Sequence, residues 1–470
     1  MAVLLLPGRA AAQANFGSEL LGGAGYVMGG TGAAVGTDPT VPLLNPARLT
    51  HVPDKSFGIA RFIHGRAHIY DNFYDPERSG DRRTTIEPEA LNSDAFDLSM
   101  LIGGLCFVTD FGTGPDEPDP DDPFHVRGYA GHHQVGFCGM PTEIDSFTGT
   151  ALHTDPAPNV QGSGSVVGEW VRRMVGFGWA WNITDDFSVG SGIFLGISRY
   201  KESVTGSSAF FDGSTPSLSA FSLDASGRSF DLVGHLGVSY RLGEHATLGA
   251  AVRLPSLNVA GSWTSTRFRA RSDGLFSRTS QGGSLTTNLP PRIVLGAGVH
   301  FDDVRAELQG SYFFPVDDFW SIQADRGTLV NQGGAADPGF MPNRRERAHA
   351  VANLGLGFEW HAFERLGFVG GVSTDFAAVD PLRAESAESR ILFRRLDRYH
   401  FSGGLSLYGD VGQLITAVRL IYGQGELRST DPLAETPSVG VVDDTELAFV
   451  AHISGRVDLP ALAGDLLSFD

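Results

Sequence analysis

Charged residues are scarce in this sequence, and long apolar runs are missing. Only 19% of the 470 residues are Asp, Glu, Lys or Arg, which is low for a soluble protein. No apolar stretch is long enough to cross a bilayer as an α-helix, and this excludes a helical membrane protein. The helical patterns that alternate with strands in α/β enzymes are also missing, so we expect a chain of strands and loops.

Cysteine is almost absent, because Cys106 and Cys138 are the only two. This number excludes a disulfide-rich scaffold and a zinc site built from cysteines. The two residues fall in neighbouring predicted strands, placed symmetrically about an acidic turn. A disulfide formed in an export compartment and a pair of buried thiols both agree with this placement.

Basic clusters and catalytic motifs are missing as well. The net charge is -19 and the Lys and Arg residues are scattered singly, so no nucleic-acid partner is expected. We find no G-x-S-x-G, H-E-x-x-H or P-loop motif, and His132, His133 and the other histidines lack ligand spacing. The acidic run at 116–122 lacks the Gly and Glu of a calcium loop and predicts a solvated turn. We therefore expect no enzyme, no metal and no cofactor.

The first fourteen residues have features of a secretory signal. They contain a short apolar core, Val3 to Leu6, and end in Ala12-Gln13-Ala14, the small-x-small pattern that a signal peptidase cleaves. A basic start is missing, so we interpret residues 1–14 as the end of a signal peptide that begins upstream. An ordinary apolar N-terminus is the alternative.

Apolar and polar residues alternate along many segments, as in strands with two different faces. In residues 292–301, Ile293, Leu295 and Val299 share one face, while Arg292 and His300 share the other. Segments 230–242, 304–313, 352–360 and 446–459 repeat the pattern. A soluble sandwich would also alternate, with its apolar face inward.

The lengths of the connections favour a barrel in a membrane. Short connections at 183–186, 243–245, 302–303, 362–365 and 409–412 alternate with much longer segments. This alternation is typical of an all-β transmembrane antiparallel barrel with short periplasmic turns and long external loops. The strands are expected to begin near residues 56, 96, 125, 166, 187, 229, 246, 291, 304, 350, 366, 398, 413 and 446, which gives about fourteen strands.

The N-terminal stretch MGGTGAAVGTDPTVPLLNPARL, Met28 to Leu49, is too rich in Gly and Pro for a helix or a central strand, yet almost uncharged. A barrel of about fourteen strands is wider than side chains alone can fill. Irregular backbone is tolerated at membrane depth where protein surrounds it. We therefore predict four parts: the signal at 1–14, a hatch (plug) inside the lumen at 15–52, the barrel at 53–459 and a C-terminal tail at 460–470.

The residues Met28-Gly29-Gly30, followed by Asp38 and then by Asn45-Pro46-Ala47, resemble the N-terminal hatch of the FadL/OmpP1/TodX family of outer-membrane long-chain fatty acid and hydrocarbon transporters. Segment 289–320 also resembles the family's pattern of a Pro-led strand, tight turn, strand and terminal Trp. Two features depart from the family: Arg48 stands where a Gly is usual, and eleven residues follow the last predicted strand.

The resemblance implies passive uptake of a fatty acid or hydrocarbon across the bacterial outer membrane, after export through the periplasm and insertion by the barrel assembly machinery. The family's third and fourth external loops form a groove that captures the ligand. The corresponding apolar residues here, in segments 202–227 and 262–289, are Phe210, Phe211, Leu218, Phe221, Leu275 and Phe276. Packing of loop against loop is the alternative role for them.

Inward-facing arginines provide candidates for binding a carboxylate head group, because guanidinium pairs with carboxylate through two hydrogen bonds. These candidates are Arg241, Arg253, Arg292 and Arg305, with Arg456 a further inward arginine. Pairing with lumen acids such as Asp231, Glu307 and Glu359 is the alternative. An outer-membrane scaffold that anchors or assembles surface proteins, a soluble secreted β protein and a surface lipase are the competing functions.

Overall fold

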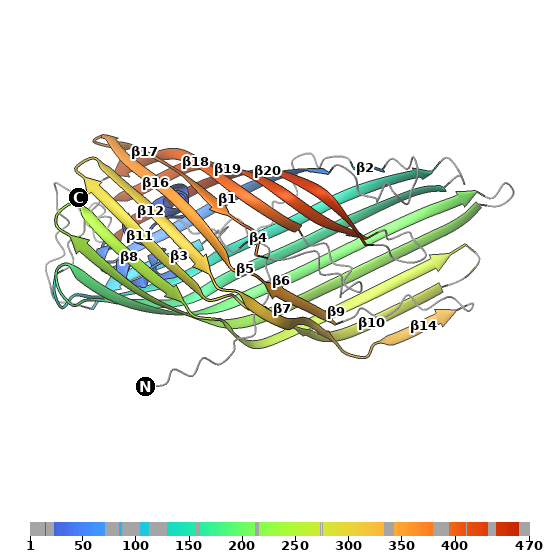
Figure 1. Cartoon of the computed structure of the whole chain (residues 1–470). Helices are drawn as coiled ribbons and strands as arrows, with labels where there is room; N and C mark the ends of the chain where they lie inside the picture. The colour runs from blue at the N-terminus through green and yellow to red at the C-terminus, as the bar shows by residue number, and fades with distance from the viewer. Residues whose placement is uncertain are drawn as a thin grey trace, which may run out of the picture.

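The computed structural model describes residues 15, 23–70, 84–86, 104–111, 129–155, 160–211, 216–272, 274, 276–332, 343–378, 394–409, 411–430 and 439–459. Most of them lie in strands of a single antiparallel sheet (Figure 1). The signal expected at 1–14, the acidic run at 116–122 and the tail at 460–470 lie outside the described residues.

The helical elements are short and precede the first strand. They are α1 (Gly23–Val27), η1 (Val41–Leu43) and η2 (Pro46–His51). In the described part of the chain, no helix has the length and apolar character needed to cross a membrane.

The strands make up the rest of the described chain. Their bounds are β1 (Ser56–Tyr70), β2 (Thr84–Ile86), β3 (Gly104–Asp110), β4 (His133–Asp155), β5 (Val160–Asn182), β6 (Phe187–Phe211), β7 (Pro216–Leu242), β8 (Ala246–Arg253), β9 (Leu257–Arg271), β10 (Phe276–Leu285), β11 (Arg292–Phe301), β12 (Val304–Phe313), β13 (Val316–Ala324), β14 (Thr328–Gln332), β15 (Arg344–Ala348), β16 (Val351–Phe363), β17 (Leu366–Asp375), β18 (Arg394–Gly409), β19 (Gly412–Thr430) and β20 (Val439–Asp458).

The sheet closes on itself because β1 pairs with β20 over its whole length, from Ser56↔Asp458 to Tyr70↔Asp444. Several strands of the wall are divided by a short break, as between β8 and β9 at residues 254–256. Counting each divided strand once gives fourteen strands, as the sequence predicts. On its other side β1 pairs with β3 from Ser56 to Ala60, and this pairing completes the ring of strands.

The wall is apolar outside and polar inside. Leu295, Leu308 and Leu354 on the outer face are 60%, 56% and 62% exposed, whereas Arg305 and Glu307 on the inner face are buried. A soluble protein would bury the leucines and expose the charges, so the interpretation as a soluble β protein is wrong. An apolar band around a closed barrel is the surface that a membrane-spanning barrel presents to lipid.

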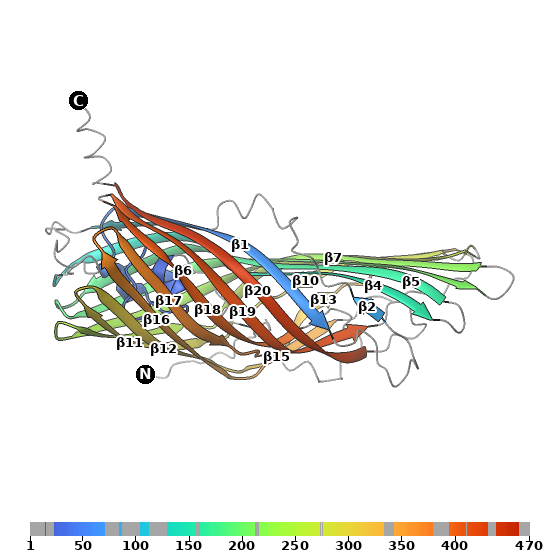
Figure 2. The ribbon, with the colours of Figure 1, turned by 90° about the horizontal axis from the view of Figure 1, so that it is seen from above.

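Strands β4 to β7 extend, together with β9, β10 and β14, beyond the other strands at the end opposite the short turns (Figures 1 and 2). They contain 23, 23, 25 and 27 residues, about twice the 9–11 that a tilted strand needs to cross a membrane. The start predicted near 229 is consequently wrong, because β7 begins at Pro216.

The segments predicted as long loops, 202–227 and 262–289, are mostly strand instead: they continue β6, β7, β9 and β10. The sequence did not reveal this because the extensions are rich in Ser, Thr and Gly, and their outward positions are polar, such as Asp224 and Ser226 on β7. Backbone pairing continues there without the apolar and polar alternation that marks a membrane strand.

Candidate functional site: the barrel lumen and its N-terminal segment

The segment from Gly23 to Val52, called here the N-terminal segment, packs against the inner side of the wall near the end with the short turns (Figure 2). Its helix α1 contacts β16 to β20, and η2 contacts β4 to β7. Tyr26, Val27 and Leu49 are at most 1% exposed. The segment therefore spans the inner width of the barrel between two opposite parts of its wall.

Glycines in the wall let the segment approach the strands at backbone distance. A Cβ added at Gly357 or Gly371 would collide with the backbone of Met28, and one at Gly249 with the carbonyl of Ala33. Gly29 itself has a φ of 74°, a conformation that few residues besides Gly adopt. The Met-Gly-Gly motif therefore packs against glycines of the wall, where no side chain keeps the two backbones apart.

The side chain of Asn45 links the backbone at Ala33, the start of η2 and strand β7 of the wall. Its side-chain amide donates to the carbonyl of Ala33 at 2.7 Å and to that of Val238 at 3.0 Å. Its side-chain oxygen accepts from the Ala47 N–H at 3.1 Å and caps η2, whose first residue is Pro46. The Asn-Pro-Ala sequence thus combines a helix cap, a suitable first residue and a cross-link to β7.

Arg48, which stands at the position of the usual Gly, is buried in these contacts. Its Nε donates to the carbonyl of Gly36 at 3.2 Å, and its Nη1 donates to Ser239 Oγ at 3.2 Å. The departure from the family motif therefore adds a bridge between the segment and β7. Asp38 stabilises the neighbouring turn by accepting from the backbone N–H of Thr40 at 3.0 Å.

Three successive inward residues of β12 hold the middle of the segment. The carboxylate of Glu307 accepts from the N–H groups of Ala34 and Val35, both at 3.0 Å. Gln309 accepts from Ala33 N–H at 3.2 Å and donates to the Gly30 carbonyl at 3.0 Å. Since buried N–H groups need acceptors, these side chains replace the partners that a sheet would give this coil.

Arg305 is the third of these residues. Its Nη1 donates to the Val35 carbonyl at 3.1 Å and to Thr37 Oγ1 at 2.8 Å, while its Nε donates to Glu359 at 2.7 Å. The side chains of Arg305 and Glu359 are both almost fully buried. Arg305 therefore pairs with a lumen acid, which is the alternative to binding the head group of a ligand.

A second polar layer lies further along the lumen. The connection between β10 and β11 carries Thr287, which donates to Asp231 Oδ2 at 2.5 Å. Asn258 donates to the other oxygen of Asp231 at 3.0 Å, and Arg172 Nε donates to Ser198 Oγ at 3.0 Å. The sequence analysis named Asp231 as a lumen acid but did not name Arg172 or Thr287. Arg172 could have been found, because it lies in the row of β5 residues that face inward.

Arg253 and Arg292 are brought together by the pairing of β8 with β11, which places them directly opposite one another. Both are buried, and their guanidinium carbons lie 5.6 and 5.4 Å from the centre of the Phe313 ring. Arg253 Nη2 donates to the Pro290 carbonyl at 3.4 Å. Arg241 lies apart from them, where it pairs with Asp186 beside a short turn at 2.8 Å.

The extended part of the barrel contains an apolar cluster, called here the outer cluster. It comprises the buried residues Leu223, Ala225, Trp263, Leu285 and Ile322, with Tyr200, Val204, Phe221 and Ala324 packed against it. Of the residues nominated for a capture groove, Phe221 belongs to this cluster. Phe276 packs instead on Phe268, with ring centres 5.3 Å apart, and Leu218 is 54% exposed. Leu275 and the side chains of Phe210 and Phe211 lie outside the described residues.

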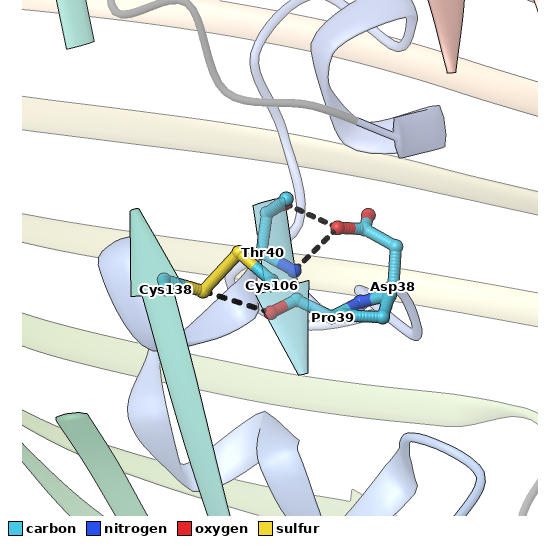
Figure 3. The surroundings of a disulfide bond; sticks show 5 residues. All are labelled: Asp38, Pro39, Thr40, Cys106 and Cys138. Atoms are coloured by element: carbon cyan, nitrogen blue, oxygen red, sulfur yellow. Dashed lines mark hydrogen bonds between the residues drawn. A yellow bond between two sulfur atoms is a disulfide. The ribbon is translucent and has the colours of Figure 1, made fainter. Parts of the chain in front are cut away.

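Cys106 and Cys138 form a disulfide between β3 and β4 (Figure 3). The two residues oppose one another directly, and both are fully buried. Cys138 Sγ lies 3.1 Å from the carbonyl oxygen of Pro39, so the bridge contacts the turn at Asp38 to Thr40. The disulfide therefore joins two strands of the wall at the place where the N-terminal segment contacts them.

We expect the double variant Cys106→Ser/Cys138→Ser to lower the free energy of unfolding by about 3 kcal/mol, because the bridge closes a loop of 32 residues in the unfolded chain. The free energy is measured by urea unfolding in detergent micelles. The fraction of folded barrel at each urea concentration is read from its heat-dependent gel mobility. Cys106→Ala/Cys138→Ala is the control, since it introduces no buried hydroxyl. A loss below 1 kcal/mol in both variants would contradict the expectation.

Comparison with known proteins adds evidence on the fold. No protein-family model matches the sequence, and no curated protein matches it either. Solved structures of hydrocarbon transporters and channels align over nearly the whole chain. The toluene transporter TodX of Pseudomonas putida shares 13% identity at a TM-score of 0.55, covering 96% of this chain and 100% of its own.

Two further structures agree with the first. The toluene transporter TbuX of Ralstonia pickettii has 15% identity, a TM-score of 0.54 and coverages of 94% and 99%. The monoaromatic hydrocarbon channel CymD has 14% identity, a TM-score of 0.54 and coverages of 93% and 97%. At these identities the likeness establishes the fold. The chain therefore has the fourteen-strand fold of the FadL-type hydrocarbon channels, which the N-terminal motif predicts.

Proposed function

We propose that this protein is an outer-membrane channel for the passive uptake of hydrophobic small molecules. The observation that carries the proposal is the N-terminal segment, whose backbone is bound by inward side chains such as Glu307 and Gln309 across the inside of a wide barrel. In this proposal the segment is the hatch, and its movement opens the path. The barrel assembly machinery inserts the chain after its export through the periplasm.

The outer cluster is the proposed first site for the cargo. It gathers Trp263, Phe221 and aliphatic side chains inside the extended wall, beyond the polar layer of Asp231 and Thr287. Burial of apolar cargo against such side chains releases water from both surfaces, which favours binding. The solved structures with this fold include toluene transporters and a monoaromatic hydrocarbon channel, and their cargo agrees with an apolar site.

The test is uptake of radiolabelled toluene and of a labelled long-chain fatty acid by cells that produce the protein. The proposal expects uptake of at least one cargo above that of cells with an empty vector, and a decrease of about tenfold in Trp263→Asp, which places a charge among the apolar side chains. Leu218→Asp is the control, because Leu218 lies on the exposed side of β7. Uptake at background level for both cargoes would refute the channel and favour the scaffold for surface proteins.

The pair of Arg253 and Arg292 is the basis of a separate proposal for a fatty acid as cargo. Two buried guanidinium groups placed side by side attract a carboxylate, which can accept hydrogen bonds from both. We therefore propose that carboxylate-bearing cargo binds here. The double variant Arg253→Gln/Arg292→Gln is expected to reduce uptake of the fatty acid about tenfold and to leave toluene uptake within twofold. If the double variant reduced uptake of both cargoes equally, the proposal that these two arginines bind a carboxylate head group would be wrong.

A further inference from the structure

A basic surface lies on the outer face of β5, β6 and β7, outside the lumen. It consists of Arg173, Arg199 and Arg228, and all three side chains are exposed. Arg199 and Arg228 oppose one another directly in the pairing of β6 with β7. Arg173 lies on β5, two residues from Val171, which opposes Arg199. The three guanidinium groups therefore share one patch of the barrel wall.

The arrangement is unfavourable without an anion. Like charges directly opposite on one face of a sheet destabilise the pair, because their Cβ atoms are only about 5 Å apart. Within the described part of the chain, no ion pair joins any of the three arginines to a carboxylate. The nearest outward acids have other neighbours: Glu169 opposes Lys201, and Asp224 accepts from Ser203 Oγ at 2.7 Å.

The height of this patch along the barrel indicates what binds there. On β6 the outward residues Ile193 and Leu195 are exposed and apolar, and Arg199 follows Ile197 in the same row. On β7 the row runs from Leu232 through Phe230 to Arg228. The arginines thus stand immediately above the apolar band, on the side away from the short turns, where lipid head groups lie.

We propose that Arg173, Arg199 and Arg228 bind a phosphate group of a phosphorylated glycolipid in the outer leaflet. Guanidinium presents a fork of N–H donors that matches phosphate oxygens, and one phosphate between Arg199 and Arg228 removes their repulsion. The chain carries a net charge of -19, so a local basic patch is what allows it to approach an anionic lipid. The position in the outer leaflet rests on the proposed outer-membrane function, whereas the phosphate chemistry rests on the patch itself.

The test compares lipid retention by the full chain, purified in mild detergent and analysed by native mass spectrometry. The probes are bisphosphorylated lipid A, the same lipid after removal of both phosphates, and inorganic phosphate as a competitor. The variant Arg199→Gln/Arg228→Gln removes the opposed pair. The control Arg278→Gln/Arg347→Gln removes the same charge from exposed positions of β10 and β15. Heat-dependent gel mobility verifies that each variant is folded, and Arg173→Gln provides a milder variant.

The expected result is about tenfold weaker retention of bisphosphorylated lipid A in the Arg199/Arg228 variant, with no change in the control and weak binding of the dephosphorylated lipid to all forms. Equal retention by the wild type and this variant would overturn the proposal. So would an equal loss in the control, or displacement of the lipid by millimolar phosphate, which indicates a site for the free anion. Retention of the lipid by a protein that transports no cargo would refute the proposed function and leave this site standing.

Discussion

Deletion of residues 15–52 is expected to convert a barrel that conducts few ions into an open pore, with at least about a tenfold rise in single-channel conductance. The reason is geometric. A fourteen-strand wall is too wide for its side chains to close the lumen. The deleted residues include α1, η1 and η2, which contact β16–β20 and β4–β7 and which the proposed function assigns to the hatch. The measurement is the conductance of the purified protein in a planar bilayer.

The deletion leaves the closure of the barrel between β1 and β20 untouched, because that pairing starts at Ser56. The double variant Arg278→Gln/Arg347→Gln is a suitable control, since both residues are exposed and lie away from the segment. An intact protein that already conducts as well as the deletion variant would show that the segment does not close the pore. In that event the scaffold becomes the better proposal.

The fold could be predicted from the sequence wherever the two faces of a strand meet different surroundings. In β11, β12 and β16 one face is apolar and exposed and the other faces the lumen, and residues such as Leu295 and Arg292 alternate over most of each strand. Predicted starts at 56, 187, 246, 304 and 366 agree with the structure. The prediction failed in the extended parts of β6, β7, β9 and β10, because their outward positions are polar and no apolar row marks them as strands.

The candidate site was less accessible to sequence reasoning. The motif around Gly29 and Asn45 identified the segment because its backbone conformations restrict the residue types allowed there. The wall residues that bind it gave no comparable signal. Glu307 and Gln309 are recognisable as inward-facing, but whether an inward carboxylate meets an arginine, a ligand or a backbone N–H depends on how a coil is placed in three dimensions.

Glu307→Ala is expected to raise the open probability of the channel about a hundredfold while the barrel stays folded. The substitution leaves the N–H groups of Ala34 and Val35 without their acceptor, at a cost of about 1–3 kcal/mol for each buried group. Only the closed state has these bonds, so a total near 3 kcal/mol shifts the equilibrium between closed and open by about two orders of magnitude.

Two variants separate the loss of these bonds from a general effect of removing a buried lumen acid. Glu307→Gln keeps one carbonyl oxygen as an acceptor and should have an intermediate open probability. Asp231→Ala removes a carboxylate that accepts from Thr287 and Asn258, outside the N-terminal segment, and should leave the open probability unchanged. Single-channel recording gives all three values. If Asp231→Ala opens the channel as much as Glu307→Ala, buried lumen charge controls closure, and the bonds to Ala34 and Val35 do not.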